Sequence, residues 1–411
     1  MLSHLGQVTV HVADSMMVGR IGKEPLAGSS FANSIFVIFL VMGIGMSYAI
    51  TPQTAQADGE KNIPKLTEIL KHGILINTLF GVLLAVIILS GKNLLWFFNQ
   101  PEIVVELALP YLVIITYSLL PFMLYQAFRQ FAEGLGFTKQ AMYITVAGNI
   151  LNIILNYILI FGKLGFEPMG LLGAGVATLI SRIVMALLMI SFVYFNHRFT
   201  QYWHAFKYGN FSWTLIKVNL NLGFPMAFQF IFEVSTFSLA AIMIGWMGTT
   251  QLAAHQIAIN MASISYMISL GIAAAATIRV GNQLGQKDYK TMRNAAMTCF
   301  IMAIGFMSFT AIVFILGRYF LPTLYIEDTY VIHQAAILLI VAGLFQLSDG
   351  VQVIALGALR GMSDVKIPTL ITLVAYWIIG LPLGYVLGFT LNQGALGVWY
   401  GLLAGLTIAA V

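Results

Sequence analysis

Three carboxylates lie within long apolar stretches of the sequence: Asp14, Glu233 and Asp349. A charge at the centre of a membrane-spanning helix costs roughly 2.5–3.5 kcal/mol on insertion scales, so such a residue usually has a function. No lysine lies deep within these stretches, and Arg182 is the only basic residue that we place deep in one. A carboxylate without a cationic partner can be protonated or can bind a cation. Either state suits ion-coupled transport, and the alternative is a carboxyl group that only hydrogen-bonds between helices.

Side-chain amides and a hydroxyl in other apolar stretches can supply further oxygen ligands for a cation. Asn149, Asn152 and Asn156 share one apolar stretch, and Thr178 lies in the next. Asn152 and Asn156 are four residues apart, so they lie on one helix face. Hard cations prefer oxygen ligands. Hydrogen bonding between helices explains these asparagines equally well.

Other chemistry finds no support in the sequence. It contains no G-x-x-x-x-G-K-[ST], no G-x-S-x-G, no H-E-x-x-H and no C-x-x-C, and its seven histidines form no cluster with metal-ligand spacing. We therefore expect no enzyme, no ATPase partner and no cofactor apart from Na⁺ or H⁺ as a coupling ion.

Long apolar elements must position these groups. Of 411 residues, 59% are hydrophobic and only 9% are charged, and the mean hydropathy is +0.90. This composition excludes a soluble enzyme or a nucleic-acid-binding protein and indicates a multi-pass membrane protein. We expect the first and last spans to be clipped, because each is short and the sequence ends inside an apolar run. The lengths predict about twelve helical spans, near 1–18, 28–52, 69–90, 105–128, 140–162, 170–195, 214–244, 252–278, 294–317, 330–358, 367–390 and 395–411.

The loop charges predict the orientation. The alternate loops that begin after the second span carry 14 lysines and arginines, including Arg129 and Arg360, and the other loops carry five. Cytoplasmic loops are enriched in basic residues. We therefore expect both termini in the cytoplasm.

The sequence also repeats itself. Residues 17–22 (MVGRIG) are echoed by 243–248 (MIGWMG) at an offset of 226, which also relates Thr51 to Thr277 and Lys61 to Lys287. An offset of 227 relates Gly134 to Gly361. Six spans per half give a parallel repeat, which predicts an all-α protein of two pseudo-symmetric six-helix lobes. We expect an N-lobe over 1–195, a cytoplasmic linker over 196–213 and a C-lobe over 214–411.

Glycines recur every fourth residue in the last two spans, at 380, 384 and 388 and at 397, 401 and 405. Small residues at this spacing let helices approach closely. We interpret them as packing positions and not as a site.

Several motifs in order resemble the multidrug and toxic compound extrusion (MATE) family, and specifically its NorM-like branch. The matching stretches cover essentially the whole chain: 13–22 with 26–27, 52–53, Asn152 and Asn156 with Ile160 and Gly162, 173–177, 252–256, 279–282 and 358–361.

The resemblance implies a multi-pass protein of a bacterial-type inner membrane that exports organic cations and drugs by alternating access, in exchange for Na⁺ or H⁺. It implies a cation site in the N-lobe at Asp14, Asn152, Asn156 and Thr178, and a C-lobe acidic pair at Glu233 and Asp349; either set could hold Na⁺. We expect a monomer in contact with membrane lipid and with no nucleic acid. The alternative is a flippase for lipid or lipid-linked substrates.

Overall fold

The computed structural model describes residue 10, residues 13–200 and residues 212–411. Within these residues the chain is helical and contains no strand. Ten helical stretches are long and apolar enough to cross a membrane, and Gly394–Ala410 is a shorter apolar helix. The predicted first span falls mostly outside the described residues, but its residues 13–18 are described and belong to a helical segment, 13–19. The prediction of an all-helical protein with many spans is confirmed.

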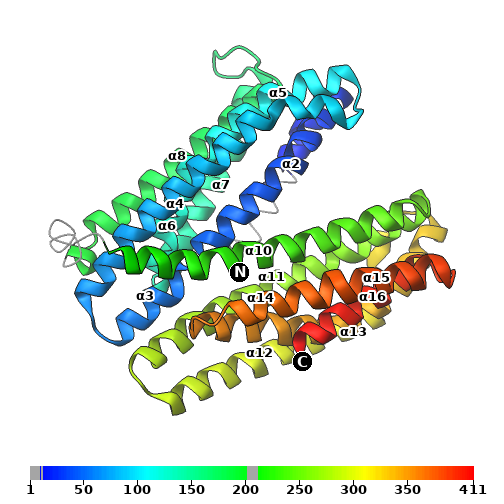
Figure 1. The fold of residues 1–411 in the computed structure, drawn as a ribbon. Coiled ribbons are helices and arrows are strands. Elements are labelled where there is room, and N and C mark those ends of the chain that lie inside the picture. The colour runs from blue at the N-terminus through cyan, green and yellow to red at the C-terminus, as the bar shows by residue number, and fades with distance from the viewer. Residues whose placement is uncertain (1–9, 11–12, 201–211) are drawn as a thin grey trace. The chain divides into compact units, whose positions relative to one another are not determined.

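The chain divides into two compact units, Leu2–Ala227 and Phe228–Val411. In the first unit α2 packs on α5, α6 packs on α4 and α8, and α7 packs on α8 (Figure 1). The core includes Leu84, Leu112 and Met123, which are almost fully buried. The helices are α2 (Lys23–Ser47), α3 (Ile50–Gly59), α4 (Ile63–Gly91), α5 (Glu102–Tyr117), α6 (Leu119–Gly134), α7 (Thr138–Phe161) and α8 (Leu171–Phe195), with short 3₁₀ turns η1 (Lys92–Phe98) and η2 (His197–Phe199).

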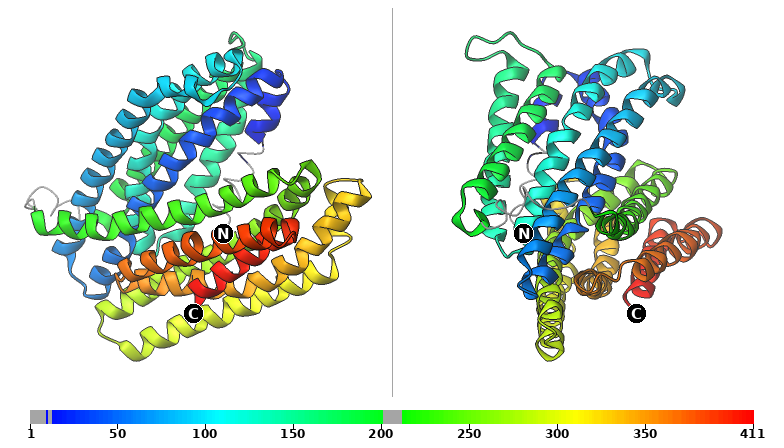
Figure 2. Two further views of the ribbon diagram at one scale, coloured as in Figure 1. Left: turned by 45° about the vertical axis from the view of Figure 1, so that its right-hand side comes forward. Right: turned by 60° about the vertical axis from the view of Figure 1, so that its left-hand side comes forward.

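In the second unit α13 packs against α11, α12 and α16. Figure 2 shows α12 and α13, in yellow and gold, running side by side. The core centres on Trp399, Leu339 and Ala258. The helices are α10 (Trp213–Gly245), α11 (Thr249–Gly285), α12 (Tyr289–Leu316), α13 (Thr329–Gly361), α14 (Lys366–Leu373), α15 (Leu381–Tyr385) and α16 (Gly394–Ala410), with a 3₁₀ turn η3 (Leu321–Leu324) and π-helical segments η4 (Val374–Gly380) and η5 (Val386–Thr390).

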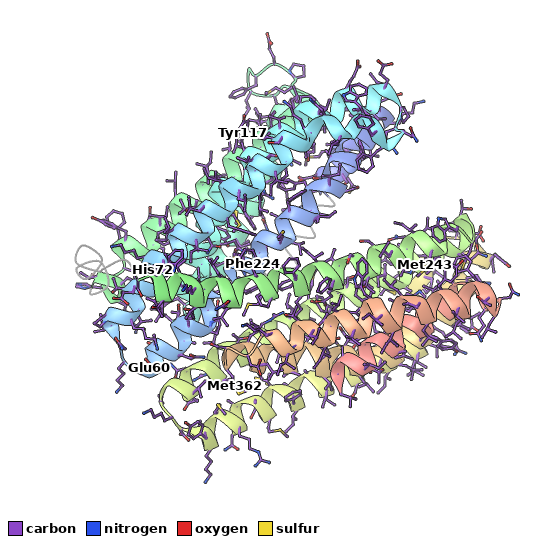
Figure 3. The ribbon with its side chains drawn as sticks, viewed as in Figure 1. Glu60, His72, Tyr117, Phe224, Met243 and Met362 are labelled. Atoms are coloured by element: carbon purple, nitrogen blue, oxygen red, sulfur yellow. The ribbon has the colours of Figure 1, made fainter. Side chains whose placement is uncertain are left out.

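The boundary between the units falls inside α10, later than the predicted lobe boundary at 213/214. The first part of α10 packs in the first unit: Asn219 Oδ1 accepts a hydrogen bond of 3.0 Å from Gln53, and the ring of Phe224, labelled in Figure 3, lies 6.0 Å from that of Phe80. Most of the predicted linker, 196–213, lies outside the described residues.

Two equivalent turns support the sequence repeat. Lys61 follows α3, Lys287 follows α11, and both adopt left-handed backbone angles with φ of 54° and 60°. The next residue caps the following helix in each case. The Asn62 side chain accepts from the Lys65 amide, and the Asp288 side chain accepts from the Thr291 amide, both at 3.0 Å.

A second pair of equivalent contacts lies deeper in each unit. The Thr51 hydroxyl donates to the Gln130 carbonyl at 3.3 Å, and the Thr277 hydroxyl donates to the Gly357 carbonyl at 2.8 Å. Residues 130 and 357 are related by the offset of 227. The same residue-to-residue contact therefore recurs in both halves, which confirms the pseudo-symmetric prediction.

We expect Gly361→Ala to destabilise the protein. A Cβ at Gly361 would lie 2.7 Å from the Thr277 carbonyl oxygen, which is backbone and cannot move aside cheaply. Overpacking of this kind costs about 1–3 kcal/mol. Gly305→Ala is the control, because no atom lies within 4 Å of its Cβ position in α12, and alanine stabilises a helix interior by roughly 0.5–1 kcal/mol. Thermal unfolding in detergent should give a lower midpoint for Gly361→Ala only; equal midpoints would contradict the packing.

The glycines of the last spans pack as predicted. The helix α16 contacts η4, α15 and η5. A Cβ at Gly384 would lie 3.2 Å from the Val398 carbonyl oxygen, and one at Gly405 would lie 3.0 Å from the Ala375 carbonyl oxygen. A Cβ at Gly401 would lie only 2.4 Å from the Gly384 Cα, so glycine is required for these backbones to approach so closely.

Candidate functional site

The first unit brings together four of the predicted site residues. Asp14 lies on the helical segment 13–19, Asn152 and Asn156 on α7, and Thr178 on α8. The Asn156 amide donates to Asp14 Oδ1 and, at 3.1 Å, to Asn152 Oδ1. The Asn152 amide in turn lies 3.4 Å from Thr178 Oγ1. The i, i+4 spacing on α7 therefore builds a continuous polar chain from Asp14 to α8.

One buried oxygen in this cluster lacks a partner. Asn156 is fully buried, and its Oδ1 accepts no hydrogen bond from any residue that the structure describes. A buried acceptor without a donor costs roughly 1–3 kcal/mol. The cluster supplies a carboxylate, amide oxygens and a hydroxyl, which is the ligand chemistry of a hard cation. The residues thus fit a small cation at Asp14, or a proton on its carboxylate.

Asn149 is not part of this chain of hydrogen bonds. Its Nδ2 is buried and has no partner among the described residues. It lies on α7 one turn before Asn152, but contacts neither Asp14 nor Thr178 by any hydrogen bond found there. It therefore serves as a natural comparison for Asn156.

Sequence reasoning missed the surroundings of Asp14. The Arg182 guanidinium donates to Ser118 Oγ at 2.8 Å and lies 4.8 Å from the centre of the Phe122 ring. Its charge also acts on Asp14, although the described residues form no ion pair between the two. Arg182, the one basic residue predicted to lie deep in a span, is therefore the cationic group that acts on this carboxylate. No spacing rule could reveal this, because Arg182 and Asp14 lie on different helices.

Ser118 marks a break in a predicted continuous span. The stretch 105–128 is divided into α5 and α6, and Ser118 Oγ donates to the Ile115 carbonyl at 2.5 Å. Tyr117, labelled in Figure 3, ends α5 beside it. The break lets the serine accept from Arg182. A buried serine that bonds to its own helix bends it in this way.

The second unit holds the other predicted pair. Glu233 on α10 and Asp349 on α13 are 7% and 6% exposed and line one cavity of about 370 Å³. The Tyr266 hydroxyl, on α11, donates to Glu233 Oε1 at 3.0 Å. The cavity walls are largely apolar, and Phe230, Phe237 and Phe345 are among the lining residues. Carboxylates beside aromatic rings suit a cation.

Several basic residues counted as loop residues lie within helices, and two of them, Arg360 and Arg129, make contacts inside their units. Arg360 lies in the last turn of α13, stacks 5.1 Å from the centre of the Phe230 ring, and donates to Gln229 Oε1 at 3.1 Å. Its charge also acts electrostatically on Glu233. Arg129 lies in α6 and is buried, with Nε 2.8 Å from Glu133 Oε1. Without these two residues, the loops predicted to be cytoplasmic still carry more lysines and arginines than the other loops. The cytoplasmic location of both termini stays a prediction.

Across the residues that the structure covers, no group of three or more His, Cys, Asp and Glu side chains could hold a metal ion. The polar chain at Asp14 differs from such a site because amide and hydroxyl oxygens supply most of its ligands.

Comparison with known proteins identifies the family. The MatE family model matches residues 1–158 and 225–386. The chain belongs to the MatE family. Its relatives include the probable multidrug resistance protein NorM of Agrobacterium fabrum, 34% identical over 100% of this chain and 89% of the relative. The multidrug resistance protein NorM of Photobacterium profundum is also 34% identical, over 100% of this chain and 91% of the relative.

Solved structures share this MatE fold. A MATE crystal structure in the bent conformation has a TM-score of 0.91 at 20% identity, covering 100% of this chain and 90% of that chain. The eukaryotic MATE transporter AtDTX14 has a TM-score of 0.86 at 21% identity, covering 98% and 90%. This MatE chain is thus a multi-pass membrane protein, as its composition predicted.

Asn156→Leu should remove the oxygen and the hydrogen bonds that define the Asp14 cluster of this MatE protein. We expect ion-gradient-driven efflux from proteoliposomes to fall by roughly tenfold or more, because a hydrogen bond to a charged group contributes about 1.5–3 kcal/mol. Asn149→Leu is the matched control and should retain efflux within about twofold. Equal effects of the two substitutions would contradict the assignment of Asn156.

Proposed function

We propose that the protein is a multidrug antiporter that exports organic cations and drugs in exchange for Na⁺ or H⁺. The observation that carries this proposal is the half-buried Asp14 carboxylate, which accepts a hydrogen bond from Asn156. The Oδ1 of this buried asparagine accepts no hydrogen bond from the described residues. Membership of the MatE family and the multidrug resistance relatives support it.

The Asp14 cluster is the proposed coupling site. Asp14, Asn152, Asn156 and Thr178 would supply oxygen ligands to Na⁺, or Asp14 would carry the coupling proton. Asn156 holds Asp14 through its amide N–H, so the carboxylate stays oriented whether or not an ion is present. The neighbouring charge of Arg182 limits how strongly the carboxylate attracts a further cation, which favours release as well as binding.

The cavity at Glu233 and Asp349 is the proposed second cation site. Its aromatic walls can cover the apolar part of a drug while the carboxylates pair with its charge. Glu233 and Asp349 could alternatively take part in ion coupling, as the resemblance to the NorM-like branch implies. Its volume of about 370 Å³ lies at the lower end for small-molecule sites.

Coupling requires that the ion and the drug differ in affinity for the conformations of the protein. In the proposed cycle, an ion taken up from outside favours a conformation that holds the drug weakly, so the drug leaves outward. Release of the ion to the cytoplasm restores the conformation that binds drug. Competition between the ion and the drug for the same carboxylates is the simplest source of this difference in affinity. We place the protein in a bacterial-type inner membrane as a monomer with both termini cytoplasmic and no ATPase partner.

Proteoliposomes loaded with ethidium or a fluoroquinolone test this proposal. A sodium gradient and a proton gradient are imposed separately, and efflux is followed by fluorescence. We expect one gradient to drive efflux, which also identifies the ion. Absence of efflux under both gradients, with folded protein, would contradict antiport and would favour the flippase, for which transfer of a fluorescent lipid between leaflets is the corresponding assay.

A further inference from the structure

The cavity in the second unit contains a polar group that the proposed function does not use. This group is His255, which lies near the beginning of α11. The cavity is also lined by Tyr266 and by the carboxylates of Glu233 and Asp349. Positions 255 and 266 are separated by about 16 Å along the α11 axis, at a rise of 1.5 Å per residue. The cavity thus combines an acidic region beside Tyr266 with a histidine about three turns earlier in α11.

Hydrogen bonding fixes the state of His255. The Trp399 indole N–H lies 3.1 Å from His255 Nδ1. An indole nitrogen can only donate, so Nδ1 must accept and carries no proton. The ring is therefore neutral, and its single proton is on Nε2.

Packing holds this arrangement rigidly. His255 is 1% exposed and Trp399 is fully buried. The two rings meet edge to face at 5.7 Å, and Phe345 stacks on the other side of Trp399 at 5.3 Å with an interplanar angle of 20°. The orientation of the imidazole is thus set by its aromatic surroundings.

The Nε2–H group has no acceptor in the described part of the protein. Among the residues that the structure describes, the hydrogen bond from Trp399 is the one found for the His255 ring. A donor that loses water to a ligand without gaining an acceptor is costly. Since His255 lines the cavity, a ligand there can supply the missing acceptor.

We propose that His255 is a specificity-determining residue that selects organic cations carrying a hydrogen-bond acceptor, such as a carbonyl oxygen, at a distance from the charge. This inference rests on the proposed function, in which the cavity takes organic cations. The carboxylates bind the cationic end of the ligand, and the Nε2–H of His255 donates to its acceptor. A cation of the same shape without the acceptor leaves the donor unpaired and binds more weakly.

Matched ligands test the proposal. One series is benzyldimethylammonium with an alkyl chain of six, eight or ten carbons that carries a methyl ketone near its end. The second series replaces the ketone oxygen with CH₂, which preserves shape and charge. Binding to the purified protein in detergent is measured by calorimetry. We expect the ketone to bind about fivefold tighter than its alkene at one chain length or more, in line with a hydrogen bond of about 1 kcal/mol.

Three variants test whether His255 causes the preference for the ketone. His255→Phe keeps a ring against Trp399 and should reduce the preference to less than about 1.5-fold. Trp399→Phe removes the donor that fixes the tautomer and should reduce the preference at least twofold, which covers the case in which His255→Phe does not fold. His333→Phe, a histidine on α13 outside the cavity lining, is the control and should keep the full preference.

The outcomes separate this inference from the proposed function. Equal affinity for ketone and alkene in the unmodified protein at every chain length would overturn the role of His255. A preference that keeps its full size in His255→Phe or in Trp399→Phe would overturn it as well. Neither result would overturn the proposed function. Failure of either series to bind, together with absence of ion-driven efflux, would instead overturn the proposed function.

Discussion

Asp14→Asn is expected to abolish efflux driven by an ion gradient while leaving the protein folded. The substitution preserves the shape of the side chain but removes its negative charge and its capacity to hold a proton. Loss of one charged partner costs about 1.5–3 kcal/mol, which corresponds to a roughly 10- to 100-fold weaker interaction with the coupling ion. Efflux of ethidium from proteoliposomes under the driving gradient is the measurement, and size-exclusion chromatography checks the fold.

Asp288→Asn is the matched control for this prediction. Asp288 caps α12 and lies outside the spans, where hydrogen bonds from the side chain and backbone of Thr291 hold its pKa below its ordinary value. It is therefore charged at neutral pH, so the same charge is removed away from the site. Asparagine caps a helix as well as aspartate does. Gradient-driven efflux that persists in Asp14→Asn would refute a direct coupling role for Asp14.

The second large effect is expected in the cavity of the second unit. The double variant Glu233→Gln and Asp349→Asn should bind organic cations at least roughly tenfold more weakly, since it removes both carboxylates from a largely apolar cavity. Affinity for butyltriphenylphosphonium, measured by calorimetry, reports the change. The Tyr266 hydroxyl, which donates to Glu233 Oε1, can donate equally to the amide oxygen of a glutamine side chain, so the cavity should keep its shape.

Asp328→Asn controls for the loss of a carboxylate elsewhere in the second unit. Asp328 caps α13, where its Oδ1 accepts from the Tyr330 amide at 2.8 Å, and asparagine can do the same. We expect unchanged affinity in this variant. Equal binding by the double variant and the unmodified protein would show that the cavity does not recognise cations through its carboxylates.

Much of the polar chain at Asp14 was predictable from spacing. Asn152 and Asn156 are one helical turn apart, and the structure joins them by a hydrogen bond of 3.1 Å. Their link to Asp14 was implied only by the resemblance, because no local pattern connects residues 142 positions apart. Asn149 fits the same helical spacing almost as well, yet it lies outside the chain of hydrogen bonds. Spacing identifies a face of a helix but not which residues of that face meet a neighbour.

The neighbours contributed by other helices were not predictable. Arg360 follows an apolar run and was counted as a loop residue, but α13 continues to Gly361 and places its guanidinium beside Phe230. Tyr266 and His255 stand in α11 among ordinary apolar residues, and only the packing of neighbouring helices against α11 gives them partners. Aromatic residues are so frequent in this chain that composition cannot separate those that line a cavity from those that face lipid.

The repeated turns have a consequence for the history of the two sites. Thr51 and Thr277 make the same contact in their respective halves. We infer that the helix packing of both halves derives from the duplication of one ancestral half. The carboxylates do not repeat in this way. The offset of 226 pairs Asp14 with Ala240, and the offset of 227 pairs Asp349 with Phe122. The two acidic sites are therefore not copies of each other. Each arose, or was lost from its counterpart, after the duplication.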